Sequence, residues 1–319
     1  MRPIHTTLPA PTGGMLRAER PTGITMAFVV IFIALVVQSL PMLVQAISEG
    51  VKAALNGTVY SFTGTSFDNA NATLTLFSFG LGILWLWFWM AVKERRSFAT
   101  LGFESISRGI RLGGRGVLIG IIMMAICVLV PVITGQATLQ WASPDGTTFA
   151  FMAIMLLGFL VQGSTEEILT RGYLTQAVAR RWGLLTAVIV QAVFFALLHG
   201  VNPGIGFLPI VNLLLFAVFA SLMSLAEGSL WGVCAMHGAW NWAQGNLFGV
   251  AVSGNPVEAA MLRYESNAGS ADLLTGGTFG IEGSLVTTVV YLVGAFIAWK
   301  IWQKRRANTA AEGAISREP

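Results

Sequence analysis

The stretch Ser164–Tyr173 reads S-T-E-E-I-L-T-R-G-Y and lies inside a long apolar run, residues 148–174. Charges at membrane depth are costly, and they are usually paired and functional. On a helix, Glu167 and Arg171 stand four residues apart and share a face, so we expect them to form an ion pair. Glu166 points about 100° away from Glu167 around the helix axis. A second carboxylate without a cation beside it suits a general base.

The composition favours an integral membrane protein over a soluble globule. The chain has 319 residues, of which 55% are hydrophobic and only 11% are charged. The net charge of +4 does not favour a nucleic-acid partner. Two cysteines, Cys127 and Cys234, each lie in an apolar run and predict neither a disulfide framework nor a cysteine-based metal site.

Apolar runs separated by polar loops predict an all-α, polytopic fold with about eight transmembrane helices and the site inside the helical bundle. The expected spans are residues 24–47, 73–92, 116–133, 148–174, 184–199, 207–226, 229–248 and 284–302. The corresponding organisation is a disordered cytoplasmic tail (1–21), N-terminal spans (22–147), a core (148–246), an extracytoplasmic loop (247–283), a last span (284–303) and a cytoplasmic tail (304–319).

The basic residues indicate the orientation of this arrangement. Of the 19 lysines and arginines, 17 fall on the side of the two termini, and only Lys52 and Arg263 fall on the other side. The count on the termini side includes Arg171 and Lys300, which lie at membrane depth. Cytoplasmic loops carry the excess of basic residues, so both termini are expected in the cytoplasm and the lipid bilayer is an expected partner.

Two of the three histidines lie in apolar spans, and hairpin geometry predicts their depth. Glu166 and His199 lie about equally far in sequence from a turn near residues 181–183, so both fall roughly 25 Å from it. His237 and Asn241 follow the next turn, near 227–228, at roughly 14 and 20 Å, and share one helix face. These four side chains converge if the hairpins are offset.

Such a constellation suits hydrolysis of an amide. Glu166 and His199 can hold and deprotonate a water, while His237 and Asn241 can donate hydrogen bonds to the oxyanion that forms. Glu167 and Arg171 would orient and screen the pair. H-E-x-x-H is absent, which excludes a zincin-type site. A metal held by Glu166, His199 and His237, with zinc as the candidate, is compatible with the ligand types.

Three other interpretations stay open on the residues alone. The polar side chains could form a network that joins helices without chemistry. They could form a proton relay in a proton-coupled transporter or channel. The chain could also be a non-catalytic membrane scaffold or immunity protein, which would tolerate Glu166→Gln.

The motifs resemble those of the CPBP family of intramembrane proteases, often called metalloproteases. This family includes CAAX prenyl endopeptidases and bacteriocin self-immunity proteins. Its patterns E-E-x-x-x-R, F-x-x-x-H and H-x-x-x-N match Glu166-Glu167 with Arg171, Phe195 with His199, and His237 with Asn241 over about residues 148–246.

The resemblance implies endopeptidase activity on a membrane protein or lipid-anchored peptide. It assigns Glu166 as the base, His199 as its partner, and His237 with Asn241 as the oxyanion hole. The remaining spans look like the divergent flanks of bacterial members, which implies a multi-pass protein of a bacterial plasma membrane.

Overall fold

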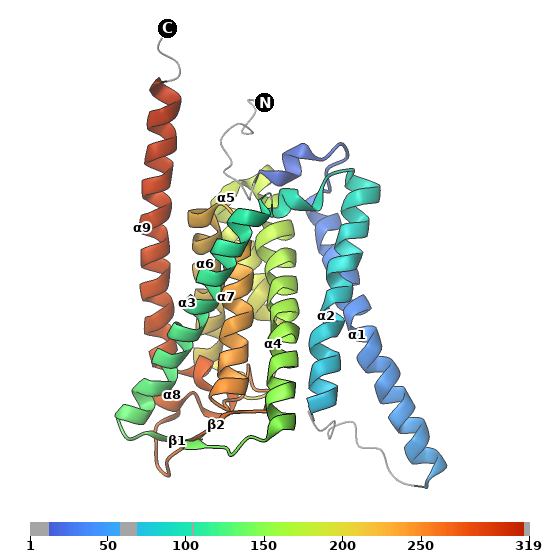
Figure 1. Cartoon of the computed structure of the whole chain (residues 1–319). Helices are drawn as coiled ribbons and strands as arrows, with labels where there is room; N and C mark the ends of the chain where they lie inside the picture. The colour runs from blue at the N-terminus through green and yellow to red at the C-terminus, as the bar shows by residue number, and fades with distance from the viewer. Residues whose placement is uncertain (1–12, 58–68, 104, 316–319) are drawn as a thin grey trace.

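The computed structural model describes residues 13–57, 69–103 and 105–315, and Figure 1 shows a bundle of long helices. The α-helices are α1 (Ile24–Leu55), α2 (Asn69–Trp89), α3 (Ile106–Ile133), α4 (Gly146–Glu167), α5 (Thr175–Leu198), α6 (Phe207–Glu227), α7 (Trp231–Trp242), α8 (Asp272–Thr275) and α9 (Leu285–Ile315). Three π-helical segments extend them: η4 (Met90–Glu94) follows α2, η6 (Ile168–Leu174) joins α4 to α5, and η7 (Ala243–Leu247) follows α7.

Within the described residues, six helical stretches are long and apolar enough to cross a membrane. The longest, Gly146–Leu198, is interrupted at Gly183, whose φ of 83° is open to glycine but strained for other residues. It therefore supplies two spans, and α7 with η7 adds a shorter one. The structure is an all-α polytopic membrane protein, and the predicted count of eight is reached only by counting in this way.

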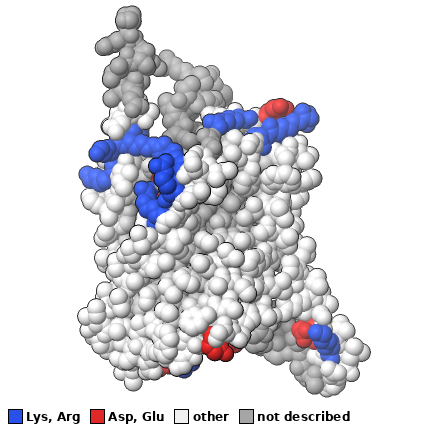
Figure 2. Space-filling model, viewed as in Figure 1, with Lys and Arg blue, Asp and Glu red and all other residues white. Residues whose placement is uncertain are grey.

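The two ends of the bundle differ in charge. Helix α1 begins and α9 ends at one end, here called the tail end, and the opposite end is here called the loop end (Figure 1). Figure 2 shows most of the visible lysine and arginine side chains gathered at the tail end. Lys52 near the end of α1 and Arg263 in the loop before α9 belong to the loop end. The charge asymmetry expected from the sequence is therefore present in three dimensions.

The loops at the loop end contain a small sheet that the all-α prediction omitted. Strand β1 (Ala137–Trp141) pairs antiparallel with β2 (Leu262–Ser266), with Leu139 opposite Tyr264. The two strands come from different loops, so the pairing fastens the segment before α4 to the segment before α9. The pairing could not be predicted from the sequence, because the two short strands lie more than a hundred residues apart and neither has a local pattern that indicates its partner.

The described residues beside the two chain ends are helical. Residues 1–12 lie outside the described residues, but Gly14–Arg17 form a short 3₁₀ helix and the Met15 side chain is fully buried. The prediction of disorder is therefore wrong for this part of the first tail. At the other end, α9 continues as a helix to Ile315 instead of giving way to a tail near residue 304.

Close packing of glycines sets the position of α7 between α3 and α4. A Cβ on Gly116 of α3 would overlap the carbonyl oxygen of Gly232, and one on Gly120 would overlap that of Met236. On the other side, a Cβ on Gly163 of α4 would overlap the backbone of Gly238. Small residues at membrane helix interfaces let the backbones approach closely. These contacts fix the helix that carries two of the expected site residues.

Candidate active site

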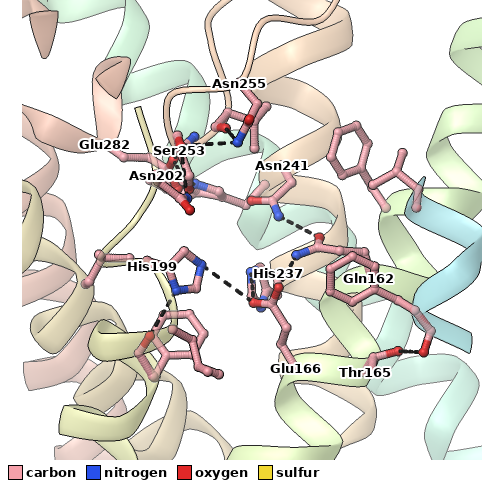
Figure 3. A pocket seen from close by; sticks show the side chains of 18 of the residues that line it. Gln162, Thr165, Glu166, His199, Asn202, His237, Asn241, Ser253, Asn255 and Glu282 are labelled. Atoms are coloured by element: carbon pink, nitrogen blue, oxygen red, sulfur yellow. Dashed lines mark hydrogen bonds and ion pairs between the residues drawn. The ribbon is translucent and has the colours of Figure 1, made fainter. Parts of the chain in front are cut away.

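A cavity of about 430 Å³ lies among α1, α2, α4, α5, α6, α7 and α9, and part of its lining comes from the loop residues Val252, Ser253, Asn255, Pro256 and Val257. Four of the expected site residues line it: Glu166 near the end of α4, His199 directly after α5, and His237 and Asn241 on α7. Figure 3 shows these side chains facing one another across the cavity. Segments separated by up to 75 positions in the sequence therefore meet, as the depth argument requires.

The expected ion pair between Glu167 and Arg171 is present behind the cavity wall. Arg171 Nη1 lies 2.9 Å from Glu167 Oε1, and both side chains are almost fully buried. The guanidinium of Arg171 also lies 4.3 Å from the ring centre of Phe195 and 5.4 Å from that of Phe216. Cation–π contacts of this kind stabilise a cation away from water. Phe195 thus holds Arg171 as well as filling space.

Hydrogen bonds at Nδ1 fix the tautomers of the two histidines. His199 Nδ1 lies 2.9 Å from the carbonyl oxygen of Phe195, and His237 Nδ1 lies 2.9 Å from Glu167 Oε1. Carbonyl and carboxylate oxygens only accept hydrogen bonds, so both Nδ1 atoms carry the proton. In the neutral rings, each Nε2 therefore presents a lone pair.

Both Nε2 atoms face the same oxygen of Glu166. Glu166 Oε2 lies 4.0 Å from His199 Nε2 and 3.8 Å from His237 Nε2, and it is buried with no hydrogen-bond partner among the described residues. These separations exceed a direct hydrogen bond but allow one water to bond to two of the three atoms. A water at this point can donate a hydrogen bond to each of two acceptors.

Gln162 joins Glu166 to Asn241. The sequence analysis did not predict Gln162 as a site residue. Its Nε2 donates to Glu166 Oε1, and its Oε1 accepts a 2.9 Å hydrogen bond from Asn241 Nδ2. Gln162 precedes Glu166 by four residues, so its place on the same helix face was the available signal. Asn241 keeps a second N–H that it can offer to a substrate oxygen.

The donor set matches zinc in chemistry but not in spacing. A carboxylate and two imidazoles are suitable ligands, and each imidazole has its Nδ1 oriented as metal-bound histidines do. Tetrahedral zinc ligands lie roughly 3.3 Å apart, as bonds of about 2.0–2.1 Å require. The separations of 3.8 and 4.0 Å are wider, and no group of three or more His, Cys, Asp or Glu in the described part of the chain is close enough to hold an ion.

Comparison with known proteins supports the resemblance read from the motifs. Residues 148–243 match the family model described as type II CAAX prenyl endopeptidase Rce1-like. No curated protein and no solved structure matches the chain. The matched segment runs from the start of α4 to the start of η7 and contains all six expected site residues. The match confirms the family resemblance for this core and supports an endopeptidase of the CAAX-protease type.

Proposed function

We propose that the chain is an intramembrane endopeptidase in which Glu166 activates a water to hydrolyse peptide bonds of membrane-associated substrates. The observation that carries the proposal is the convergence of Glu166 Oε2 with Nε2 of His199 and of His237 inside the cavity. A fixed carboxylate beside a fixed imidazole lone pair can orient a water and accept its proton.

In the proposed reaction, a water lies between Glu166 Oε2 and His199 Nε2. Glu166 takes one proton as the water oxygen bonds to the carbonyl carbon of the scissile amide. The oxyanion accepts hydrogen bonds from Asn241 and from His237. Its collapse breaks the C–N bond, and Glu166 passes its proton to the nitrogen of the departing amine.

The structure adds a condition to the role of His237. Its Nδ1 proton is committed to Glu167, so its Nε2 can donate to an oxyanion only in the doubly protonated form. Glu167 Oε1, which also contacts Arg171 Nη1, fixes the orientation of the His237 ring from its Nδ1 side.

We further propose that both termini lie in the cytoplasm of a bacterial cell and that the substrate is a membrane protein or lipid-anchored peptide. The concentration of basic residues at the tail end supports the orientation. The site's position within the helical bundle supports a substrate that reaches it from the membrane.

The test is cleavage of quenched fluorescent peptides by purified protein in liposomes. The variants are Glu166→Gln, His199→Ala and the control Glu265→Gln, whose carboxylate is exposed on β2. We expect cleavage to be lost in the first two and kept in the control. Cleavage that survives in both site variants would contradict the proposal and favour a proton relay or a structural network. A chelator added to the wild type, with and without zinc returned, reports whether a metal takes part.

A further inference from the structure

The loop before α9 forms part of the cavity that holds Glu166. Residues 252–257, here called the roof segment, contribute Val252, Ser253, Asn255, Pro256 and Val257 to the cavity lining. Figure 3 shows Ser253 and Asn255 across the cavity from Glu166 and beside Asn241. The segment belongs to a glycine- and serine-rich loop whose position in the sequence suggests a cover over the site, but its composition does not indicate which residues line the cavity.

One carboxylate holds the roof segment in place. Glu282 Oε2 accepts hydrogen bonds from the backbone N–H of Ser253 at 2.8 Å, from its hydroxyl at 2.9 Å, and from Gln244 Nε2 at 3.2 Å. Glu282 Oε1 accepts a 3.1 Å hydrogen bond from Trp240 Nε1. Both oxygens of this buried carboxylate are therefore hydrogen-bonded to the protein.

These bonds connect the roof segment to both halves of the candidate site. Trp240 and Gln244 flank Asn241 along α7 and η7. The carbonyl oxygen of Ser253 accepts a 3.1 Å hydrogen bond from Asn202 Nδ2, and Asn202 N donates to the carbonyl oxygen of His199. Ser253 and Glu282 therefore link the chain that follows His199 to the helix that carries His237.

The loop packs against the helical bundle on both sides of the roof segment. On one side, Val252 and Ala259 pack in an apolar cluster with Leu76 of α2 and with Met155 and Phe159 of α4.

On the other side, Gly254 N donates to the carbonyl oxygen of Phe279. A Cβ on Gly254 would overlap the carbonyl oxygen of Pro203 in the turn between α5 and α6. Contact on both sides leaves no room for the segment to shift without breaking bonds.

We propose that Glu282 is a positioning residue that holds the roof segment over the active site and thereby closes the cleft toward the loop end. The closed roof favours substrates that arrive from the bilayer over soluble peptides from the loop-end solution. This selectivity rests on the proposed endopeptidase function, whereas the closure itself does not.

The experiment measures closure by cysteine labelling. Thr75 of α2 lines the same cavity, so Thr75→Cys reports access to it, and the parent chain gives the background from the buried Cys127 and Cys234. A membrane-impermeant maleimide is applied to the loop end of oriented vesicles. We expect slow labelling, accelerated about tenfold or more by Glu282→Gln, since the new amide brings a donor to the donors of Ser253 and Gln244. Glu265→Gln is the control and should leave the rate unchanged.

A second variant covers the case in which Glu282→Gln does not fold. Gly254→Ala keeps Glu282 and forces the roof away from Pro203, so it should accelerate labelling as well. Two results would overturn the proposal. One is fast labelling of Thr75→Cys with the roof segment intact, and the other is a folded roof variant that leaves the labelling rate unchanged.

Cleavage measurements on the same variants test the selectivity. Opening the roof should raise the cleavage of a soluble peptide relative to that of a membrane-anchored one. An inactive wild type whose labelling follows the roof variants would refute the protease proposal and leave the closure standing, so the two failures are distinguishable.

Discussion

Glu166 and Glu282 line the same cavity, yet their surroundings differ in one decisive respect. The carboxylate of Glu282 accepts four hydrogen bonds from Ser253, Gln244 and Trp240. Glu166 accepts one at Oε1, whereas its Oε2 has no hydrogen-bond partner among the described residues. Four hydrogen bonds hold Glu282 and the groups around it in place, whereas Glu166 Oε2 can still accept a hydrogen bond from a water or a substrate. The difference separates a positioning role from a catalytic one.

The largest effect is expected from Glu166→Gln, which removes the available oxygen but keeps a side chain of the same size. We expect kcat/KM for peptide cleavage to fall roughly 10²–10⁴-fold, the usual contribution of a general base. The thermal midpoint should change little, because Gln162 can still bond to the side chain. A steady-state assay with a thermal melt checks both. If activity falls only as much as the amount of folded protein, Glu166 has a structural role like that of Glu282 and not a catalytic one.

Arg171→Met is expected to act on stability first. Glu167 and Arg171 are both buried, so removing the cation leaves a buried charge with less compensation, at a cost of about 3–5 kcal/mol. Denaturant unfolding in detergent measures the effect. The double variant Glu167→Gln with Arg171→Met is the matched comparison and should recover part of the loss. If the double variant is less stable than Arg171→Met alone, the loss of stability does not come from an uncompensated charge on Glu167.

Tyr173→Phe tests a carboxylate outside the cavity that is satisfied like Glu282. Glu94 Oε1 accepts a 2.9 Å hydrogen bond from the Tyr173 hydroxyl, and Glu94 Oε2 lies 2.6 Å from Arg96 Nε. Loss of the hydroxyl leaves a buried acceptor without a partner, which costs about 1–3 kcal/mol. We expect unfolding at lower denaturant concentration but unchanged kcat per folded molecule. A large drop in kcat would show that Glu94 does more than hold structure.

The smallest effect concerns Asp145, an exposed carboxylate at the start of α4. The backbone N–H of Thr148, and then its hydroxyl, hold the pKa of Asp145 below its usual value. The stabilisation is therefore present above the unfolded pKa of about 3.9 and is lost as pH falls through the lower folded pKa. The stability difference between wild type and Asp145→Asn should be constant near neutral pH and should shrink below about pH 4. Unfolding curves across that range check it, and a difference that grows on acidification would contradict the assignment.

The sequence predicted the parts of the site that depend on helical spacing. The pairing of Glu167 with Arg171 follows from a four-residue separation, and the meeting of Glu166 with His199 follows from equal distances to a turn. Gln162 was within reach of the same argument. The roof contacts of Glu282 were not, because they join loop residues with no periodicity through long-range hydrogen bonds. The same holds for the pairing of β1 with β2.

The π-helical segments η6 and η7 lie directly after the helices that carry the site, and this has a genetic consequence. A π-helical turn holds one residue more than an α-helical turn. Deleting one codon from an ordinary α-helix rotates every later side chain by about 100° relative to the residues before it. Deleting one within Ile168–Leu174 would instead convert the segment to α-helix and keep α5 in phase with α4. This segment and Ala243–Leu247 are thus the places in the core where a one-codon loss should disturb the active site locally while sparing the bundle.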